Sequence, residues 1–235
     1  MSKFIQSAFG LQWLVYGAVS LMVLLSSVLL EHYQPGLYRP FFGRLNPILV
    51  VTLIIFLGAA LFHYLISRDY FFIFRPGNGR GLLLAVAFGA VFFLVIFVID
   101  WLVVLPQDIN RPFPASLPFY FSIGFVVEIL FHVLPLTLLL ALLTSIFPRT
   151  PWQSFVWPLI GLVALLEPLF QTAFGFSRPY PWWVMLLIAC NIYLINLAQL
   201  YLFQRYDFLS MYTLRLVYYT LWHILWGILR LRILF

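Results

Sequence analysis

The segment PFYFSIGFVVEILFHVLPLTLLLALLTSIF, residues 118–147, decides the fold of this chain. It is apolar almost throughout, and it exceeds the roughly 20 residues that a helix needs to cross the hydrocarbon core of a bilayer. One carboxyl group, Glu128, and one imidazole, His132, interrupt the apolar run. The segment therefore predicts a transmembrane helix with two polar groups inside it.

The rest of the chain repeats this pattern. Hydrophobic residues make up 64% of the 235 residues and charged residues only 9%, which excludes an ordinary soluble domain. Polar stretches rich in proline and glycine separate the apolar runs and end helices well. We expect an all-α, polytopic transmembrane helix bundle of about seven spans, at residues 10–30, 46–67, 81–105, 118–147, 155–174, 182–204 and 208–231.

The net charge of +6 comes from arginines between the apolar runs. We therefore expect contact with the lipid bilayer and its headgroups, and no binding of nucleic acid. The apolar stretch from Leu11 to Leu30 is too long for the core of a signal peptide, so we expect a retained first span. Cys190 is the only cysteine, which excludes an internal disulfide, and its apolar surroundings predict a core position.

Two prolines predict irregular helices. Pro135 lies inside the fourth span and is expected to kink it. Pro168 lies inside the fifth, where its ring would push on the carbonyl of Ala164 and bend the helix beside Glu167. Membrane helices tolerate such breaks where neighbouring helices satisfy the freed backbone groups.

Four candidate site residues lie within the spans: Glu128, His132, Glu167 and His223. A centred Asp, Lys or Arg costs roughly 2.5–3.5 kcal/mol in hydrocarbon, so an ionisable group kept there marks a candidate site. Glu128 and His132 are four residues apart and share a helix face. We expect the four to face one cavity. The alternative is that His132 simply neutralises Glu128 through a local hydrogen bond.

The other polar residues within the spans carry less information about a functional site. Arg215 lies near the start of the last span, where it can extend to the headgroups. Asp100, near the end of the third span, is expected to reach the interface. Asn196 and Gln199 form either a polar stripe towards the bundle centre or amide contacts between helices.

Two segments resemble the CPBP family of CAAX-protease and bacteriocin-processing membrane endopeptidases. The sequence Val127-Glu128-Ile129-Leu130-Phe131-His132 resembles the family's Glu-Glu-x-x-x-Arg motif. The stretch from Gln204 to Gly227 is similar to its last helix, which ends in His-x-x-x-Asn. The resemblance covers about residues 118–231. It implies a family-like core at residues 118–235, preceded by three additional helices and their loops at residues 1–117.

In that family a motif glutamate and a histidine activate water, and the last-helix histidine and asparagine stabilise the oxyanion. The resemblance places Val127 where the family has its base, and Glu128 at the second glutamate. His132 replaces the motif arginine. The middle Phe-x-x-x-His motif matches Phe170-Gln171-Thr172-Ala173-Phe174, so Phe174 stands in place of its histidine. The last-helix histidine is kept as His223, but Gly227 replaces its asparagine.

Because both water-activating residues are replaced, we expect a non-catalytic protein that binds membrane partners or serves as a subunit of a membrane complex. The alternative is an active endopeptidase acting on a transmembrane substrate helix, with a rearranged site of Glu128, His132, Glu167 and His223. A third possibility is a subunit carrying a metal or a pigment, since carboxylate and imidazole suit zinc or iron. We expect no cofactor and no metal, and we expect the chain to reside in a bacterial inner membrane.

Overall fold

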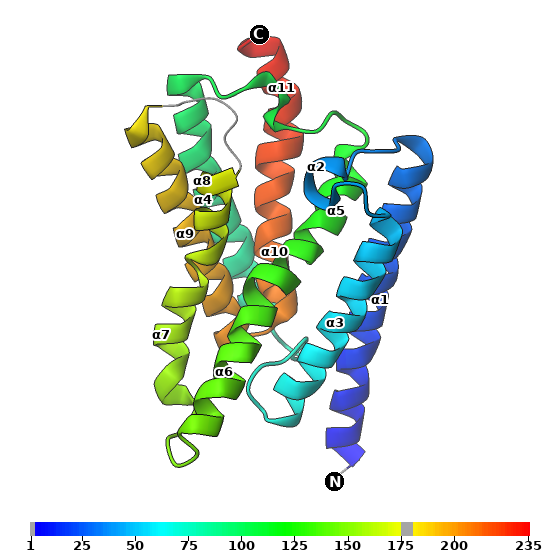
Figure 1. Cartoon of the computed structure of the whole chain (residues 1–235), viewed down its shortest axis with the longest axis vertical. Coiled ribbons are helices and arrows are strands. Elements are labelled where there is room, and N and C mark those ends of the chain that lie inside the picture. The colour runs from blue at the N-terminus through cyan, green and yellow to red at the C-terminus, as the bar shows by residue number, and fades with distance from the viewer. Residues whose placement is uncertain (1–2, 175–180) are drawn as a thin grey trace.

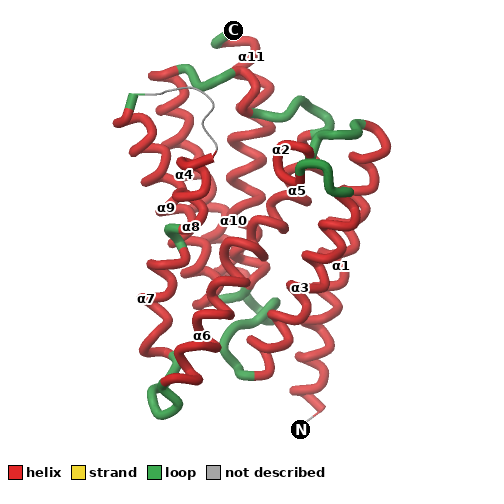
Figure 2. Tube along the Cα trace, in the orientation of Figure 1, coloured by secondary structure: helices red, strands yellow, loops and turns green. Residues whose placement is uncertain are grey.

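The computed structural model describes residues 3–174 and 181–235, with side chains from residue 9 to 171 and from 181 onward. This part of the chain is helical and contains no β-strand (Figures 1 and 2). Its elements in chain order are α1 (Lys3–Tyr33), α2 (Arg39–Phe42), α3 (Pro47–Ser67), α4 (Gly79–Val103), the short 3₁₀ turn η1 (Gln107–Ile109), α5 (Ser116–Val127), η2 (Glu128–Val133), α6 (Leu134–Ile146), α7 (Gln153–Val163), α8 (Leu166–Phe174), α9 (Trp182–Arg205), α10 (Phe208–Tyr219), η3 (Thr220–Trp226) and α11 (Gly227–Ile233).

Six helical segments of the described chain are long and apolar enough to cross a membrane. They are Phe9–Tyr33, Pro47–Ser67, Gly79–Val103, Ser116–Ile146, Gln153–Gln171 and Trp182–Arg205. The expectation of an all-α, multi-pass membrane bundle is confirmed.

The seventh expected span, formed by α10, η3 and α11, is helical but is not among these six. Figure 1 shows it running along the middle of the bundle, with α4 and α9 on one side. Its buried residues include Arg215 and Arg230. This helix is less apolar because much of its surface faces protein, where polar side chains find partners.

Two helices contain a widened, π-helical stretch. η2 joins α5 to α6 within the fourth span, and η3 joins α10 to α11. Pro135 lies two residues after the first of these stretches, in the first turn of α6, and has no backbone N–H to donate, which disrupts regular α-helical bonding at this place. The expected irregularity therefore takes the form of a wider turn that contains both Glu128 and His132. Such turns are frequent at functional sites.

The fifth span is interrupted, as Pro168 predicted. α7 ends at Val163 and α8 begins at Leu166. The carbonyl of Ala164, at the break, accepts a hydrogen bond of 3.2 Å from Nδ2 of Asn196 in α9. A neighbouring helix thus satisfies a backbone group next to the interruption.

The first three spans belong to the same bundle as the rest of the chain. α1 packs against α3 and α5, while α4 packs against α9 and α10. The hydroxyl of Tyr16 in α1 donates a 2.6 Å hydrogen bond to the carbonyl of Ile55 in α3. Aromatic rings from distant segments meet in the core, where Phe62 lies 4.9 Å from Phe208 and 6.2 Å from Phe203 between ring centroids. Cys190, expected in the core, is exposed instead.

Gly89 sets the distance between α4 and α10. A Cβ at this position would lie 2.8 Å from Cγ1 of Val217 and 3.2 Å from the carbonyl oxygen of Leu214. We expect Gly89→Ala to destabilise the protein by about 1–3 kcal/mol, as overpacking does. Gly17→Ala is the control because a Cβ there meets nothing within 4 Å. Thermal unfolding in detergent measures both, and a Gly89→Ala variant as stable as the unmodified protein contradicts this account.

Candidate functional site

Five side chains meet in the interior of the bundle and form what we call the Arg215 cluster. They are Glu128 and His132 of η2, Glu167 of α8, Gln199 of α9 and Arg215 of α10. Each is at most 3% exposed. The cluster therefore joins four parts of the chain across the interior of the bundle.

Glu128 is held from three sides. Its Oε1 accepts a hydrogen bond of 2.5 Å from Nε of Arg215 and another from the side-chain amide of Gln199. Its Oε2 lies 2.6 Å from Nδ1 of His132. Because the two glutamate oxygens have about four acceptor positions between them, most of the hydrogen-bonding capacity of Glu128 is used.

Arg215 links both carboxylates. Its Nη1 and Nη2 bind the two oxygens of Glu167 at 3.0 and 2.8 Å, a bidentate arrangement. Nη2 also donates to Oε1 of Gln199 at 3.1 Å, and Nη1 donates to the hydroxyl of Tyr219 at 3.1 Å. All three guanidinium nitrogens therefore have acceptors.

The cluster requires one more proton to be neutral. Arg215 carries one positive charge, while Glu128 and Glu167 carry two negative charges when both are ionised. A net charge in a low-dielectric interior is costly, so a proton on His132 or on one carboxyl group would remove it. Nε2 of His132 is buried and has no hydrogen-bond partner among the described residues.

Arg215 was missed as a site residue. We expected it to extend to the headgroups, which is wrong, because only 3% of it is exposed. One sequence signal pointed to it: two carboxyl groups deep in the spans need a positive charge at a similar depth, and Arg215 lies inside the last span. Gln199 was recognised as polar, but its contact with Glu128 was not predicted.

His223 makes its contacts outside the Arg215 cluster. Its Nδ1 lies 2.6 Å from Oδ1 of Asn110, and its ring stacks on Tyr120 with centroids 4.3 Å apart. Within the described residues, its connection to the cluster is indirect and passes through the ring of Tyr219, at 5.1 Å between centroids. The structure thus brings together Glu128, His132 and Glu167, but not His223.

A second buried ion pair lies near the other end of the last helix. Nε and Nη2 of Arg230 each donate at 2.8 Å to an oxygen of Asp100, and Nε1 of Trp226 donates to the same carboxylate at 2.7 Å. Asp100 and Arg230 are both 0% exposed. The expectation that Asp100 reaches the interface is therefore wrong. The sequence did contain a sign of this pair, because Arg230 had no counter-ion assigned to it and Asp100 is an acidic residue in the spans.

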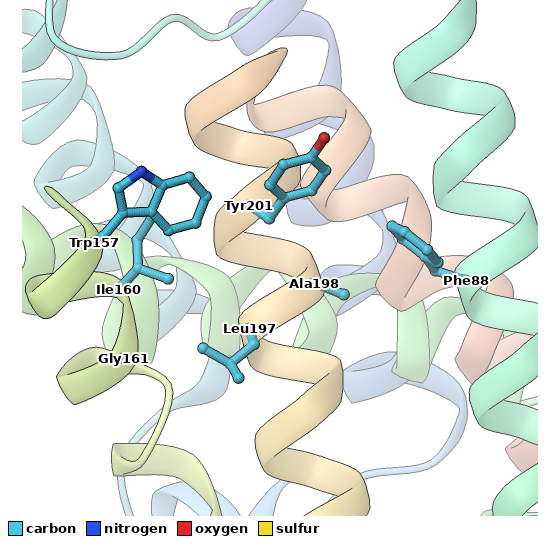
Figure 3. Close-up of a pocket in the computed structure, with 7 residues that line it drawn as sticks. All are labelled: Phe88, Trp157, Ile160, Gly161, Leu197, Ala198 and Tyr201. Atoms are coloured by element: carbon cyan, nitrogen blue, oxygen red, sulfur yellow. The ribbon is translucent and has the colours of Figure 1, made fainter.

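An apolar cavity of about 350 Å³ lies between α4, α7 and α9, as Figure 3 shows. Phe88, Trp157, Ile160, Gly161, Leu197, Ala198 and Tyr201 line it. None of these belongs to the Arg215 cluster. A larger cavity of about 900 Å³ lies beside α11. Across residues 3–174 and 181–235, no group of three or more His, Cys, Asp or Glu side chains is arranged to hold a metal ion.

Together these features define a polytopic membrane protein with an ion network buried in its helix bundle. No family model, no curated protein and no solved structure matches the chain. The resemblance to the CPBP family stays a prediction from its motifs.

Proposed function

We propose that this chain is a non-catalytic integral membrane protein that acts by binding other membrane proteins, on a scaffold resembling the CPBP endopeptidases. We place it in a bacterial inner membrane. The observation that carries this proposal is the hydrogen bonding of Glu128, whose two oxygens accept from Arg215, Gln199 and His132.

A general base needs a free acceptor position within hydrogen-bond reach of the proton it abstracts. In Glu128 three donors occupy most of the acceptor positions that a water molecule would need. The contacts with Gln199 and Arg215 tie η2 to α9 and α10, which is what a structural brace requires. Val127 and Phe174, standing where the family resemblance expects the water-activating pair, support the same conclusion.

The cavity in Figure 3 is a suitable place for a partner's transmembrane helix. Gly161 and Ala198 in its lining are small, and small residues let helix backbones approach closely in membranes. Trp157 and Tyr201 stack with ring centroids 6.2 Å apart and supply a flat apolar wall. We propose that a bulky apolar side chain of the partner helix fills this space.

Photo-crosslinking tests the binding surface directly. A photoreactive residue at Leu197, which lines the cavity, is expected to form a crosslink to a discrete second polypeptide in native membranes. The matched control is Leu53 of α3, which is 59% exposed. Equal labelling from the two positions, or crosslinks to lipid alone, would contradict the proposal.

The second candidate is the endopeptidase with a rearranged site, which the unpartnered Nε2 of His132 favours. A carboxylate on Nδ1 orients the ring and leaves Nε2 available, the arrangement in which imidazole serves as a general base. Glu128→Gln separates the two functions. We expect no change in the N-terminal peptides of the membrane proteome between cells with the wild-type protein and with this variant. Cleavage products that vanish while the variant stays folded would establish the enzyme instead.

A further inference from the structure

The cavity of about 900 Å³ lies at the end of the bundle that carries the C-terminus. Its walls are the loop between α4 and α5, from Val104 to Phe113, and the helix α11 with the residues after it. Because α4 ends at Val103 and α5 begins at Ser116, this loop lies where two membrane-spanning segments end. The cavity is therefore at the level of the lipid headgroups.

The floor of the cavity is built from tight contacts. A Cβ added to Gly227 would lie 3.1–3.3 Å from three side-chain atoms of Asn110, so the glycine lets the loop approach the helix. Oδ1 of Asn110 is in turn bonded to His223. This explains the position of His223 away from the Arg215 cluster, because it anchors the loop that lines the cavity.

The charges around the cavity favour an anion. Arg111 and Arg232 line it, and neither forms an ion pair with a carboxylate of the described chain. Asp108 is the one acidic side chain in the lining, so the lining side chains carry a formal charge of +1 from two cations and one anion. The nearby Arg230 adds nothing, because Asp100 neutralises it.

The cavity also presents apolar surface. Phe113, Leu231 and Phe235 line it and are 56%, 40% and 58% exposed. Guanidinium groups bind phosphate well, in bidentate geometry. An anionic group flanked by exposed apolar side chains at headgroup level matches the chemistry of an acidic phospholipid, and a free phosphate compound would not use the apolar part.

We infer that this cavity binds an anionic phospholipid, with the phosphate between Arg111 and Arg232 and the acyl chains against Phe113, Leu231 and Phe235. The cavity is within the range of about 300–1,000 Å³ typical of small-molecule sites, which is enough for a headgroup with part of its glycerol. This site is independent of the proposed partner surface on α4, α7 and α9.

The test uses the full chain purified in a non-ionic detergent and titrated with phosphatidylglycerol, phosphatidylcholine or glycerol phosphate. A ligand that binds the folded state raises its unfolding temperature in a saturable way. We expect phosphatidylglycerol to raise the unfolding temperature. Phosphatidylcholine and glycerol phosphate should leave it unchanged. Equal stabilisation by both lipids would overturn the anionic site, and equally tight binding of glycerol phosphate would overturn the lipid as its ligand.

Variants locate the site. Arg111→Gln combined with Arg232→Gln is expected to raise the apparent Kd for phosphatidylglycerol about tenfold or more, since each lost charge-assisted contact is strong. Arg149→Gln, in the exposed loop between α6 and α7 at the opposite end of the bundle, is the matched control and should leave it unchanged. Unchanged affinity in the double variant overturns the inference.

Asp108→Asn provides a second test of the lipid site, one that removes an acidic group and keeps both arginines. Asp108 is exposed, so the variant should fold normally. Loss of the acidic group from the lining should tighten binding of phosphatidylglycerol several-fold. An unchanged or weaker affinity would contradict the site even if the double arginine variant failed to fold.

Discussion

Arg215→Ala is expected to unfold the protein or to lower its free energy of unfolding by about 3–5 kcal/mol, the range found when one partner of a buried ion pair is removed. The substitution removes the cation that contacts Glu128 at 2.5 Å and binds Glu167 through two nitrogens. Two buried carboxyl groups would then have to be protonated or hydrated in the centre of the bundle. Thermal unfolding and retention of the monodisperse peak in detergent measure the effect.

A compensated variant distinguishes the loss of charge balance from a simple loss of packing. Arg215→Met combined with Glu128→Leu and Glu167→Leu replaces the ionic centre with apolar side chains. Such replacements are often neutral or stabilising, so the triple variant is expected to regain most of the stability. If the single Arg215→Ala variant had the same unfolding temperature as the wild-type protein, the Arg215 cluster would not contribute to stability.

The second large effect is expected from Asp100→Ala. Arg230 is 0% exposed, and it would lose the one carboxylate partner it has among the described residues while keeping the carbonyls of Leu105 and Pro106. Trp226 would lose the acceptor for its indole N–H. We expect a loss of about 3–5 kcal/mol, measured by thermal unfolding in detergent.

The control is Asp69→Asn, which removes the charge and keeps a residue type that tolerates the positive φ of 54° at this position. Asp69 is exposed in the turn after α3, and none of the ion pairs of the described chain includes it. This variant should change stability by no more than about 0.5 kcal/mol. If the two variants proved equally stable, the Asp100–Arg230 pair would contribute little to the fold.

The sequence predicted those features that depend on local chemistry. The apolar runs predicted the helices, and Pro168 predicted the interruption near Ala164, because a proline disturbs a backbone group at a fixed distance along the chain. Glu128 and His132 were expected on one helix face, and they are in contact. Each of these inferences concerns residues no more than a few positions apart.

The missed features all depend on pairs far apart in the sequence. Arg215 lies near the start of its span, where extension to the headgroups and burial against Glu128 are both compatible with its position. His223 was expected beside Glu128, but its partner Asn110 belongs to a loop that the pattern of spans does not place. Helix periodicity gives the face of a residue, but it does not give the helix that the face meets.

The π-helical stretches also set the rotational phase of the helices that follow them. Each residue of an α-helix turns the chain by about 100°, so one additional residue in a turn reorients every side chain beyond it. The side chains of α6 are therefore rotated about the helix axis relative to those of α5. Leu136 and Leu140 face inward, while Leu138 and Leu142 face outward. Loss of a single residue from η2 would rotate this pattern by nearly a third of a turn about the helix axis. The number of residues between Glu128 and Pro135 therefore fixes which side of α6 faces lipid.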